Sequence, residues 1–247
     1  KIKGLVLKIS GEHYSIKKNI ISSWAGTGLS KLAKISADAG LYGLEWSFGI
    51  PGSVGGAIRG NAGAYGGDIS KNVIEVRVYD ISKAKFVKLD NKACRFGYRH
   101  SIFKQNKNLL IAEVRLKMKS GRSEEIKKIM AENFQHRLKR QPKQPSAGCI
   151  FKNLEYKEII QQNKKLAEGL MFKGLVRGNK IGAAYLIDQL GLKDKTVGGA
   201  KISEQHANFI INTGQAQAKD VVNLINLIKR KVKHKYKINL EEEIQYF

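Results

Sequence analysis

Apolar and polar residues alternate over several short segments in the first half of the chain, which is the pattern of half-buried β-strands. The clearest segment is 73–79, and 86–89 is its expected hairpin partner. Further strands are predicted at 4–9, 20–25 and 109–116. Between them, Leu29, Leu32, Ala33 and Ile35 recur at helical spacing, and the helix is expected to end at Gly40.

The pattern changes near residue 120. A helix is predicted from Ser123 to the prolines at 142 and 145, followed by helices at 183–190 and around 221–232. Strands are predicted at 208–212 and 243–247. The segment 154–179 is polar and weakly periodic, which predicts a surface loop. We therefore expect two domains, 1–119 and 120–247, that mix helices with strands.

Glycines are concentrated in Gly49–Ala57 and Asn61–Gly67. Glycine adopts left-handed conformations and allows close approach to the backbone, so such a run is typical of a cradle for an anion or cofactor. A pair of tight surface turns is the alternative interpretation. The block contains neither Gly-Lys-Ser/Thr nor Gly-x-Gly-x-x-Gly, so a different nucleotide-cofactor geometry is indicated.

Composition narrows the class of protein. No apolar run reaches the about 20 residues of a membrane-spanning helix, and no signal peptide opens the chain, so a cytoplasmic protein is expected. The first residue is Lys1 rather than Met, so the natural start is expected to lie upstream. Cys94 and Cys149 are far apart and have no clustered histidines, which predicts neither a disulfide framework nor a metal site.

The net charge of +24 raises the possibility of nucleic-acid binding. The basic residues, however, are scattered along the chain, and the densest run, 229–235, keeps helical apolar spacing. A solvated helix face is the favoured interpretation, and no specific nucleic-acid partner is expected.

Seven motifs occur in a fixed order over almost the whole chain, and together they resemble the UDP-N-acetylenolpyruvoylglucosamine reductase family. They are the segments 43–57, 61–66, 96–104, 145–153, 186–188, 203–212 and 240–244. The resemblance implies an α+β fold, with an FAD-binding domain of the vanillyl-alcohol-oxidase (PCMH) type and a smaller α+β substrate-binding domain. Family members carry a further strand-and-loop unit before the position of Lys1, with a Gly-Ser-Asn turn for the FAD diphosphate. The FAD-binding domain is therefore expected to be N-terminally incomplete in this sequence.

The resemblance also implies the chemistry: NADPH reduces FAD, and the enolpyruvyl ether of a UDP-linked amino sugar is then reduced to a lactyl ether, in peptidoglycan precursor synthesis. Arg99 would hold the substrate carboxylate, Cys149 would protonate the enolate, and Glu243 would stabilise the enol form. The alternatives are a structural ion pair for Arg99, a small buried hydrophobe for Cys149 and solvated surface for Glu243. Glu241 and Glu242 are not expected to act, and Glu242 stands where the family usually has proline.

Two further sets of residues follow from the resemblance, and a monomer is expected. The substrate is expected to contact Tyr98, Arg140, Lys152 and Asn153. The residues expected to bind FAD are Pro51, Gly52, Ser53, Val54, Gly55, Gly56, Asn61, Gly63, Ala64, Tyr65 and Gly66. Another flavin oxidoreductase on the same scaffold and a truncated inactive homologue are the alternative functions.

Overall fold

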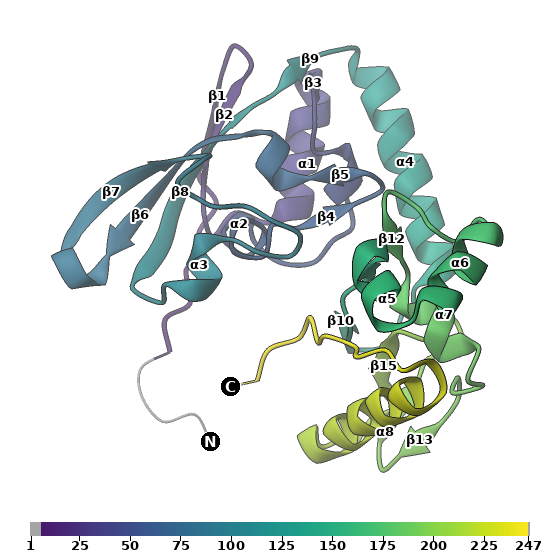
Figure 1. Cartoon of the computed structure of the whole chain (residues 1–247). Helices are drawn as coiled ribbons and strands as arrows, with labels where there is room; N and C mark the ends of the chain where they lie inside the picture. The colour runs from purple at the N-terminus through teal and green to yellow at the C-terminus, as the bar shows by residue number, and fades with distance from the viewer. Residues whose placement is uncertain (1–5, 247) are drawn as a thin grey trace. The chain divides into compact units, whose positions relative to one another are not determined.

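The chain forms two compact units, residues 1–137 and 138–247, in a computed structural model that describes residues 6–246 (Figure 1). The predicted boundary at 119/120 precedes helix α4 (Ser123–Arg140), whereas most of α4 belongs to the first unit. The reason is its packing, because Ile126 and Met130 bury against Ala37 of helix α1 (Leu29–Asp38). Within the described residues, no helix is both long and apolar enough to cross a bilayer.

The first unit is built on a five-stranded antiparallel sheet with the order β1-β2-β8-β6-β7. The predicted β6/β7 hairpin is confirmed, and Val76 of β6 lies opposite Leu89 of β7. Short helices and two-residue strands connect the five strands of this sheet. The bounds are β1 Tyr14–Lys17, β2 Ile20–Trp24, β3 Leu41–Tyr42, α2 Val54–Gly60, β4 Gly63–Ala64, β5 Gly67–Asp68, β6 Val73–Asp80, β7 Lys85–Asp90, α3 Ile102–Gln105, β8 Leu109–Lys117 and β9 Lys119–Ser120.

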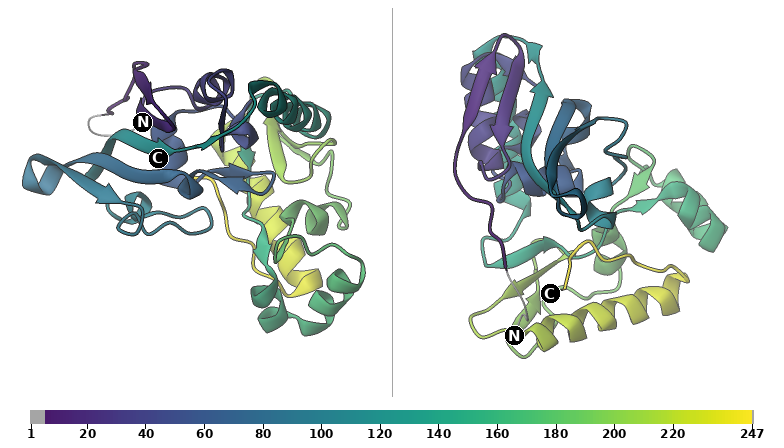
Figure 2. Two further views of the ribbon diagram at one scale, coloured as in Figure 1. Left: turned by 90° about the horizontal axis from the view of Figure 1, so that it is seen from above. Right: turned by 90° about the vertical axis from the view of Figure 1, so that its left-hand side faces the viewer.

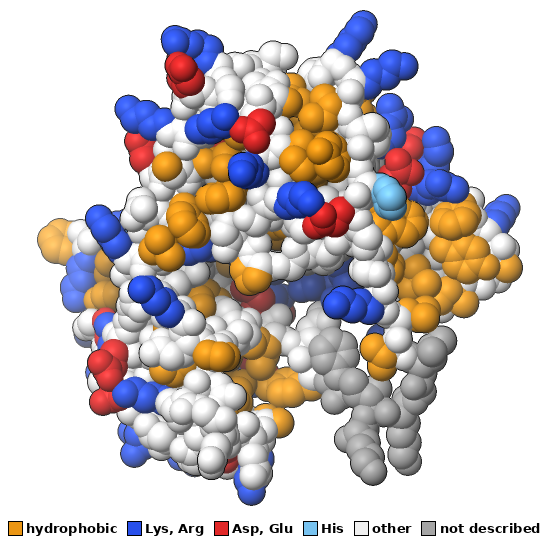
Figure 3. All heavy atoms as spheres, turned by 180° about the vertical axis from the view of Figure 1, so that it is seen from behind, with side chains coloured by type: hydrophobic (Ala, Val, Ile, Leu, Met, Phe, Trp, Pro, Cys, Tyr) orange, Lys and Arg blue, Asp and Glu red, His pale blue; other side chains and the backbone are white. Residues whose placement is uncertain are grey.

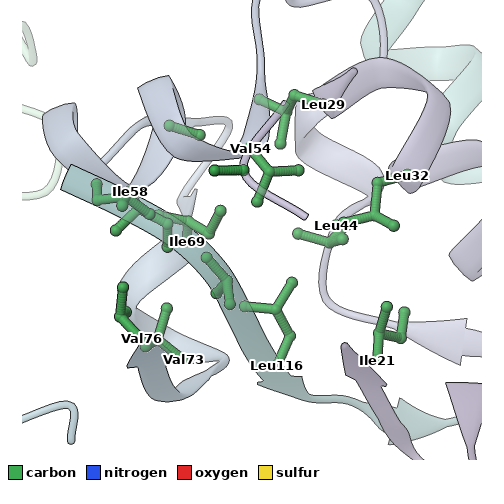
Figure 4. Packing of buried hydrophobic residues seen from close by; sticks show 14 of the residues in the cluster. Ile21, Leu29, Leu32, Leu44, Val54, Ile58, Ile69, Val73, Val76 and Leu116 are labelled. Carbon is green, nitrogen blue, oxygen red and sulfur yellow. The ribbon is translucent and has the colours of Figure 1, made fainter. Parts of the chain in front are cut away.

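The core of the first unit lies between the sheet and helices α1 and α2 (Figure 4). Helix α1 buries Leu29, Leu32, Ala33, Ser36 and Ala37, which share one face at helical spacing. Val54 and Ile58 of α2 join this cluster. The glycine-rich segment is thus attached to the core through its apolar residues.

The second unit contains a four-stranded antiparallel sheet with the order β10-β15-β14-β13. Its long helix α8 (Ala218–Tyr236) packs on β13 and β14 through Leu224, Ile225, Ile228 and Val232 (Figure 2). The predicted helices and the strand at 208–212 are confirmed within a few residues. The remaining bounds are β10 Ser146–Cys149, β11 Leu154–Glu155, α5 Tyr156–Gln162, α6 Lys164–Phe172, β12 Lys180–Ile181, α7 Ala183–Asp188, β13 Thr196–Val197, β14 Ala200–Ile202 and β15 Phe209–Asn212.

Three predictions of local structure are wrong. Residues 6–9 form no strand, and Val6 and Leu7 are exposed, while Gly4 and Leu5 lie outside the described residues. Residues 243–246 form no strand: the bridge to Phe151 lies at the preceding residue, Glu242, and Phe247 is outside the described residues. The segment 154–179 is not a loop, because it forms two short helices, α5 and α6, which bury Ile159, Ala167 and Leu170.

Candidate functional site

Several N–H groups of the glycine-rich segment bond within the first unit. Ser53 is the N-cap of α2, and its Oγ accepts a hydrogen bond from the Gly56 N–H at 3.2 Å. The N–H groups of Val54 and Gly55 donate to the carbonyls of Thr27 (2.9 Å) and Ala25 (2.8 Å). These three amides bond within the protein, and the glycines beside them also leave open space along the main chain.

That space is a cavity of about 900 Å³ in the first unit. Gly52, Ser53, Gly55 and Gly56 of the predicted cradle line it. Gly52 has a φ of +116°, and a Cβ placed there would meet nothing within 4 Å, so this glycine opens directly onto vacant space. The other lining residues are Leu7, Lys8, Ile9, Ser10, Gly11, Glu12, Ala25, Gly26, Arg59, Phe103, Lys107, Leu109, Leu110 and Ile111.

The lining suits a large ligand with an apolar ring system and an anionic part. A volume of about 900 Å³ lies in the upper part of the range of small-molecule sites, about 300–1,000 Å³. Phe103 and the strand residues 109–111 supply apolar surface, and Lys8, Arg59 and Lys107 supply positive charge. The acidic residue Glu12 is paired with Lys31. The residues of this unit therefore fit FAD, whose diphosphate would face the cations.

The second half of the predicted cradle forms a β4–β5 hairpin beside Arg99. Tyr65 and Gly66 occupy its turn with φ values of +51° and +80°, the two positive angles of a type I′ turn. The Arg99 guanidinium donates to the Gly63 carbonyl at 3.0 Å and lies 5.2 Å from the Tyr98 ring centroid. Arg99 itself has a φ of +53°, in the tight turn that Gly97 and His100 close by bonding each other's carbonyls.

Asn61 connects these two segments. Its side-chain amide donates to the Gly97 carbonyl at 2.8 Å and accepts from the Ser70 N–H at 3.2 Å, and the residue is almost fully buried. This arrangement supports a positioning role for Asn61. Direct contact with FAD stays a prediction.

The remaining predicted FAD residues do not line the cavity. Val54 is fully buried in the core, and Tyr65 packs edge-to-face on His136 of α4 with ring centroids 5.4 Å apart. Pro51 is exposed. The residues outside the cavity lining are Pro51, Val54, Asn61, Gly63, Ala64, Tyr65 and Gly66.

In the second unit, the structure brings the main chains of Cys149 and Glu243 to neighbouring positions. The Glu243 N–H donates to the carbonyl of Ile150, the residue after Cys149, at 2.8 Å. The Lys152 N–H donates to the Glu241 carbonyl at 2.9 Å, so the segments 150–152 and 241–243 run side by side. Cys149 and Glu243 are both half-buried.

Glu241 and Glu242 are engaged in ion pairs. Glu241 pairs with Lys152, and Glu242 accepts from Lys229 at 2.8 Å and from the Tyr246 hydroxyl at 2.5 Å. Burial raises the pKa of Glu242, but the hydrogen bonds from Lys229 and Tyr246 outweigh it and hold that pKa below its ordinary value. Lys152, a predicted substrate residue, is thus bonded to the C-terminal segment.

Arg140 lies exposed at the end of α4, and Asn153 is exposed just before β11. His206 accepts a hydrogen bond at Nδ1 from the Asn208 N–H (3.3 Å). Burial lowers the pKa of His206, and the charges of Lys193 and Arg140 lower it further. Among the described residues, no group of three His, Cys, Asp or Glu side chains is placed to hold a metal ion.

Sequence reasoning missed two residues of these sites, Arg59 and Asn208. Arg59 lies about one helical turn after Gly55 and Gly56, so the helical period alone places it on the face they share. Asn208 is buried and binds the main chain of Phe151. No local sequence signal marks that contact, because it joins segments far apart in the chain.

Comparison with known proteins matches both units to described families. Residues 140–247 match the C-terminal domain of UDP-N-acetylenolpyruvoylglucosamine reductase, and residues 1–90 match an FAD binding domain. A UDP-N-acetylenolpyruvoylglucosamine reductase of Solibacter usitatus is 36% identical over 245 residues, which cover 99% of this chain and 77% of that protein. The chain belongs to the UDP-N-acetylenolpyruvoylglucosamine reductase family. It is thus a member of a family of FAD-dependent oxidoreductases.

Two further relatives agree with this assignment. The Fervidobacterium nodosum reductase is 40% identical over 90% of this chain, and the chain spans 64% of that protein's length. The crystal structure of the Thermus caldophilus reductase is 38% identical and superposes with a TM-score of 0.71 over 90% of this chain and 71% of that chain. The expected α+β fold, with a PCMH-type FAD-binding domain, is confirmed.

Proposed function

We propose that the protein catalyses the NADPH-dependent reduction of UDP-N-acetylglucosamine enolpyruvate to UDP-N-acetylmuramate in the cytoplasm, as a step of peptidoglycan precursor synthesis. The observation that supports the proposal is the main-chain pairing of segments 150–152 and 241–243, which brings the chain next to Cys149 alongside that of Glu243. The family assignment supports the substrate class.

The reaction adds a hydride to the terminal carbon of the enol ether and a proton to its neighbour. Bound FAD, reduced by NADPH, supplies the hydride. Arg99 offers a permanently charged fork to the substrate carboxylate as negative charge grows on it. Cys149 donates its S–H proton to the carbanionic carbon, because a thiol with an ordinary pKa of about 8.5 is a far stronger acid than serine. Glu243 stabilises the enol form.

The other chain residues bind and orient the two ligands. Lys8, Arg59 and Lys107, which line the cavity, would neutralise the diphosphate of bound FAD, and Phe103 and residues 109–111 would contact its apolar parts. Tyr98, Arg140, Lys152 and Asn153 contact the UDP-sugar.

Substitution of Cys149 distinguishes the proposed reductase activity from the activity of another flavin oxidoreductase on the same scaffold. In Cys149→Ala, NADPH should still reduce the flavin at the normal rate, while lactyl ether formation slows by about 10²–10⁴-fold, the usual contribution of a general acid. Stopped-flow absorbance of the flavin measures the first step, and chromatography of the UDP-sugar product measures the second. Equal turnover in wild type and Cys149→Ala would refute the role of Cys149, and flavin reduction without product in the wild type would point to a different oxidoreductase.

A further inference from the structure

Segment 149–152, between the proposed proton donor and the proposed substrate residues, is held on both edges. On one edge it binds the C-terminal segment through Ile150 and Lys152. On the other edge it binds Asn208: the Ile150 N–H donates to the Asn208 carbonyl at 2.8 Å. The position of this short segment therefore sets where Cys149 lies relative to the C-terminal segment that carries Glu243.

On this second edge, the side-chain amide of Asn208 bonds the main chain of Phe151 as a neighbouring peptide group would. Its Oδ1 accepts from the Phe151 N–H at 2.9 Å, and its Nδ2 donates to the Phe151 carbonyl at 2.8 Å. Asn208 is 2% exposed and Phe151 1% exposed, so water cannot replace either bond. A buried amide that satisfies both polar groups of one residue fixes that residue in place.

Asn208 is itself fixed by a tight turn. The Ser203 hydroxyl accepts from the N–H groups of Gln205 (3.2 Å) and His206 (3.3 Å), and the His206 imidazole accepts from the Asn208 N–H (3.3 Å). The Phe209 N–H donates to the His206 carbonyl at 2.9 Å. The turn therefore gives the Asn208 amide one orientation.

We propose that Asn208 is a positioning residue that sets the location of Cys149 relative to Glu243 by holding the main chain of Phe151. The inference deepens the proposed function, on which its catalytic consequence rests. Its structural part, the control of the Cys149 environment, can be measured without any assumption about the reaction.

Alkylation of the native protein by iodoacetamide reads out Cys149 alone, because Cys94 is fully buried and burial raises its pKa to about 12. In Asn208→Ala, the Cys149 alkylation rate should rise about tenfold, because loss of two buried hydrogen bonds favours local opening of the segment. The matched control is Asn212→Ala, since Asn212 also binds main-chain N–H groups, those of Gly214 (2.8 Å) and Ala216 (3.0 Å), at the other end of β15. The control should alkylate at the wild-type rate.

Asn208→Asp provides a test that survives if the alanine variant does not fold. Near neutral pH the introduced carboxylate faces the Phe151 carbonyl and alkylation should be fast, whereas a protonated carboxyl can donate as Asn208 does. The ratio of the variant rate to the wild-type rate should therefore return toward one as the pH falls. In the reductase assay, kcat should fall by about 10²-fold for a displacement near 1 Å, with flavin reduction by NADPH unchanged.

Each outcome is decisive. Wild-type alkylation in a folded Asn208→Ala, equal acceleration in Asn212→Ala, or a pH-independent ratio for Asn208→Asp would overturn the inference. If alkylation is faster in Asn208→Ala but the wild-type protein itself reduces no UDP-sugar, the positioning role is supported and the proposed function is refuted.

Discussion

Adjacent glycines of the same motif have different surroundings, and their substitution should have different effects. A Cβ on Gly55 would lie 2.9 Å from the Ala25 Cβ and 3.1 Å from its carbonyl oxygen. A Cβ on Gly56 would meet nothing closer than the Ser53 Oγ at 3.6 Å. Both glycines line the cavity, but only Gly55 also permits close packing against Ala25.

We predict that Gly55→Ala lowers the free energy of unfolding by about 1–3 kcal/mol, the usual effect of overpacking. Gly56→Ala should leave it unchanged or raise it by about 0.5–1 kcal/mol, because alanine favours helix. Gly56→Ala should instead weaken FAD binding, because its methyl group enters the cavity lining. Urea unfolding and fluorescence titration with FAD measure the two effects. Equal destabilisation by both variants would contradict this assignment.

The two cysteines should differ in reactivity in the native protein. Burial raises the pKa of Cys94 to about 12, with a smaller contribution from the charge of Asp90, and its side chain is inaccessible. We predict that a colorimetric thiol reagent modifies one cysteine per chain at pH 8 (about the pKa of an exposed thiol) and two in denaturant. Mass spectrometry of the alkylated peptides should assign the native modification to Cys149. Modification of Cys94 at a comparable rate would show that the core around it opens readily.

At the scale of elements, the C-terminal segment 240–246 is held by main-chain bonds and by the side chain of Glu242. The ladder bonds come from Glu241 and Glu243, on either side of the bridge residue Glu242. The main-chain bonds between the two segments therefore do not use the N–H of Glu242. A proline, which has no N–H, could occupy this position without losing such a bond. In this chain the ion pair with Lys229 of α8 anchors the segment instead.

We predict that Glu242→Gln lowers the free energy of unfolding at neutral pH by about 0.5–1 kcal/mol, since Lys229 is partly solvated. The pKa of Glu242 is lowered in the folded state, so its contribution is present above the unfolded value of about 4.3 and is lost as the pH falls below it. The difference between wild type and variant should therefore vanish in acid. Urea unfolding at neutral and acidic pH measures it, with the exposed Glu241→Gln as control. A difference that persists in acid would exclude the ionised pair as its cause.

Elements with sustained periodicity could be predicted from the sequence, whereas contacts between distant segments could not. Strands β6 and β8 and helices α1 and α8 each carry enough apolar repeats to identify them. Strand β10 is short and glycine-containing, and it forms only because β15 lies beside it. The family motifs located the cradle and Cys149. They did not show that Gly55 also packs tightly against the main chain whereas Gly56 does not, since that difference depends on the position of Ala25.

At the scale of the whole molecule, the net charge of +24 is spread over the surface. In the face shown in Figure 3, Lys and Arg side chains are scattered among polar and apolar ones rather than gathered in one patch. Many cations are also paired, such as Arg115 with Glu75 and Lys127 with Asp38. This distribution favours general attraction of anionic ligands over a defined nucleic-acid interface.

The two units have separate hydrophobic cores, so a ligand that binds one unit can stabilise that unit selectively. Both tryptophans, Trp24 and Trp46, belong to the first unit, so tryptophan fluorescence reports the unfolding of that unit alone. We predict that FAD at about 100 times its dissociation constant stabilises the fluorescence transition by about 2.7 kcal/mol. The temperature at which the second unit opens, measured by Cys149 alkylation during heating, should shift much less. In Gly56→Ala the fluorescence shift should shrink at the same FAD concentration, because the added methyl group weakens binding. An equal shift of both signals would mean that the two cores unfold as one cooperative unit, and an unchanged fluorescence transition would mean that FAD does not bind the cavity beside Gly52.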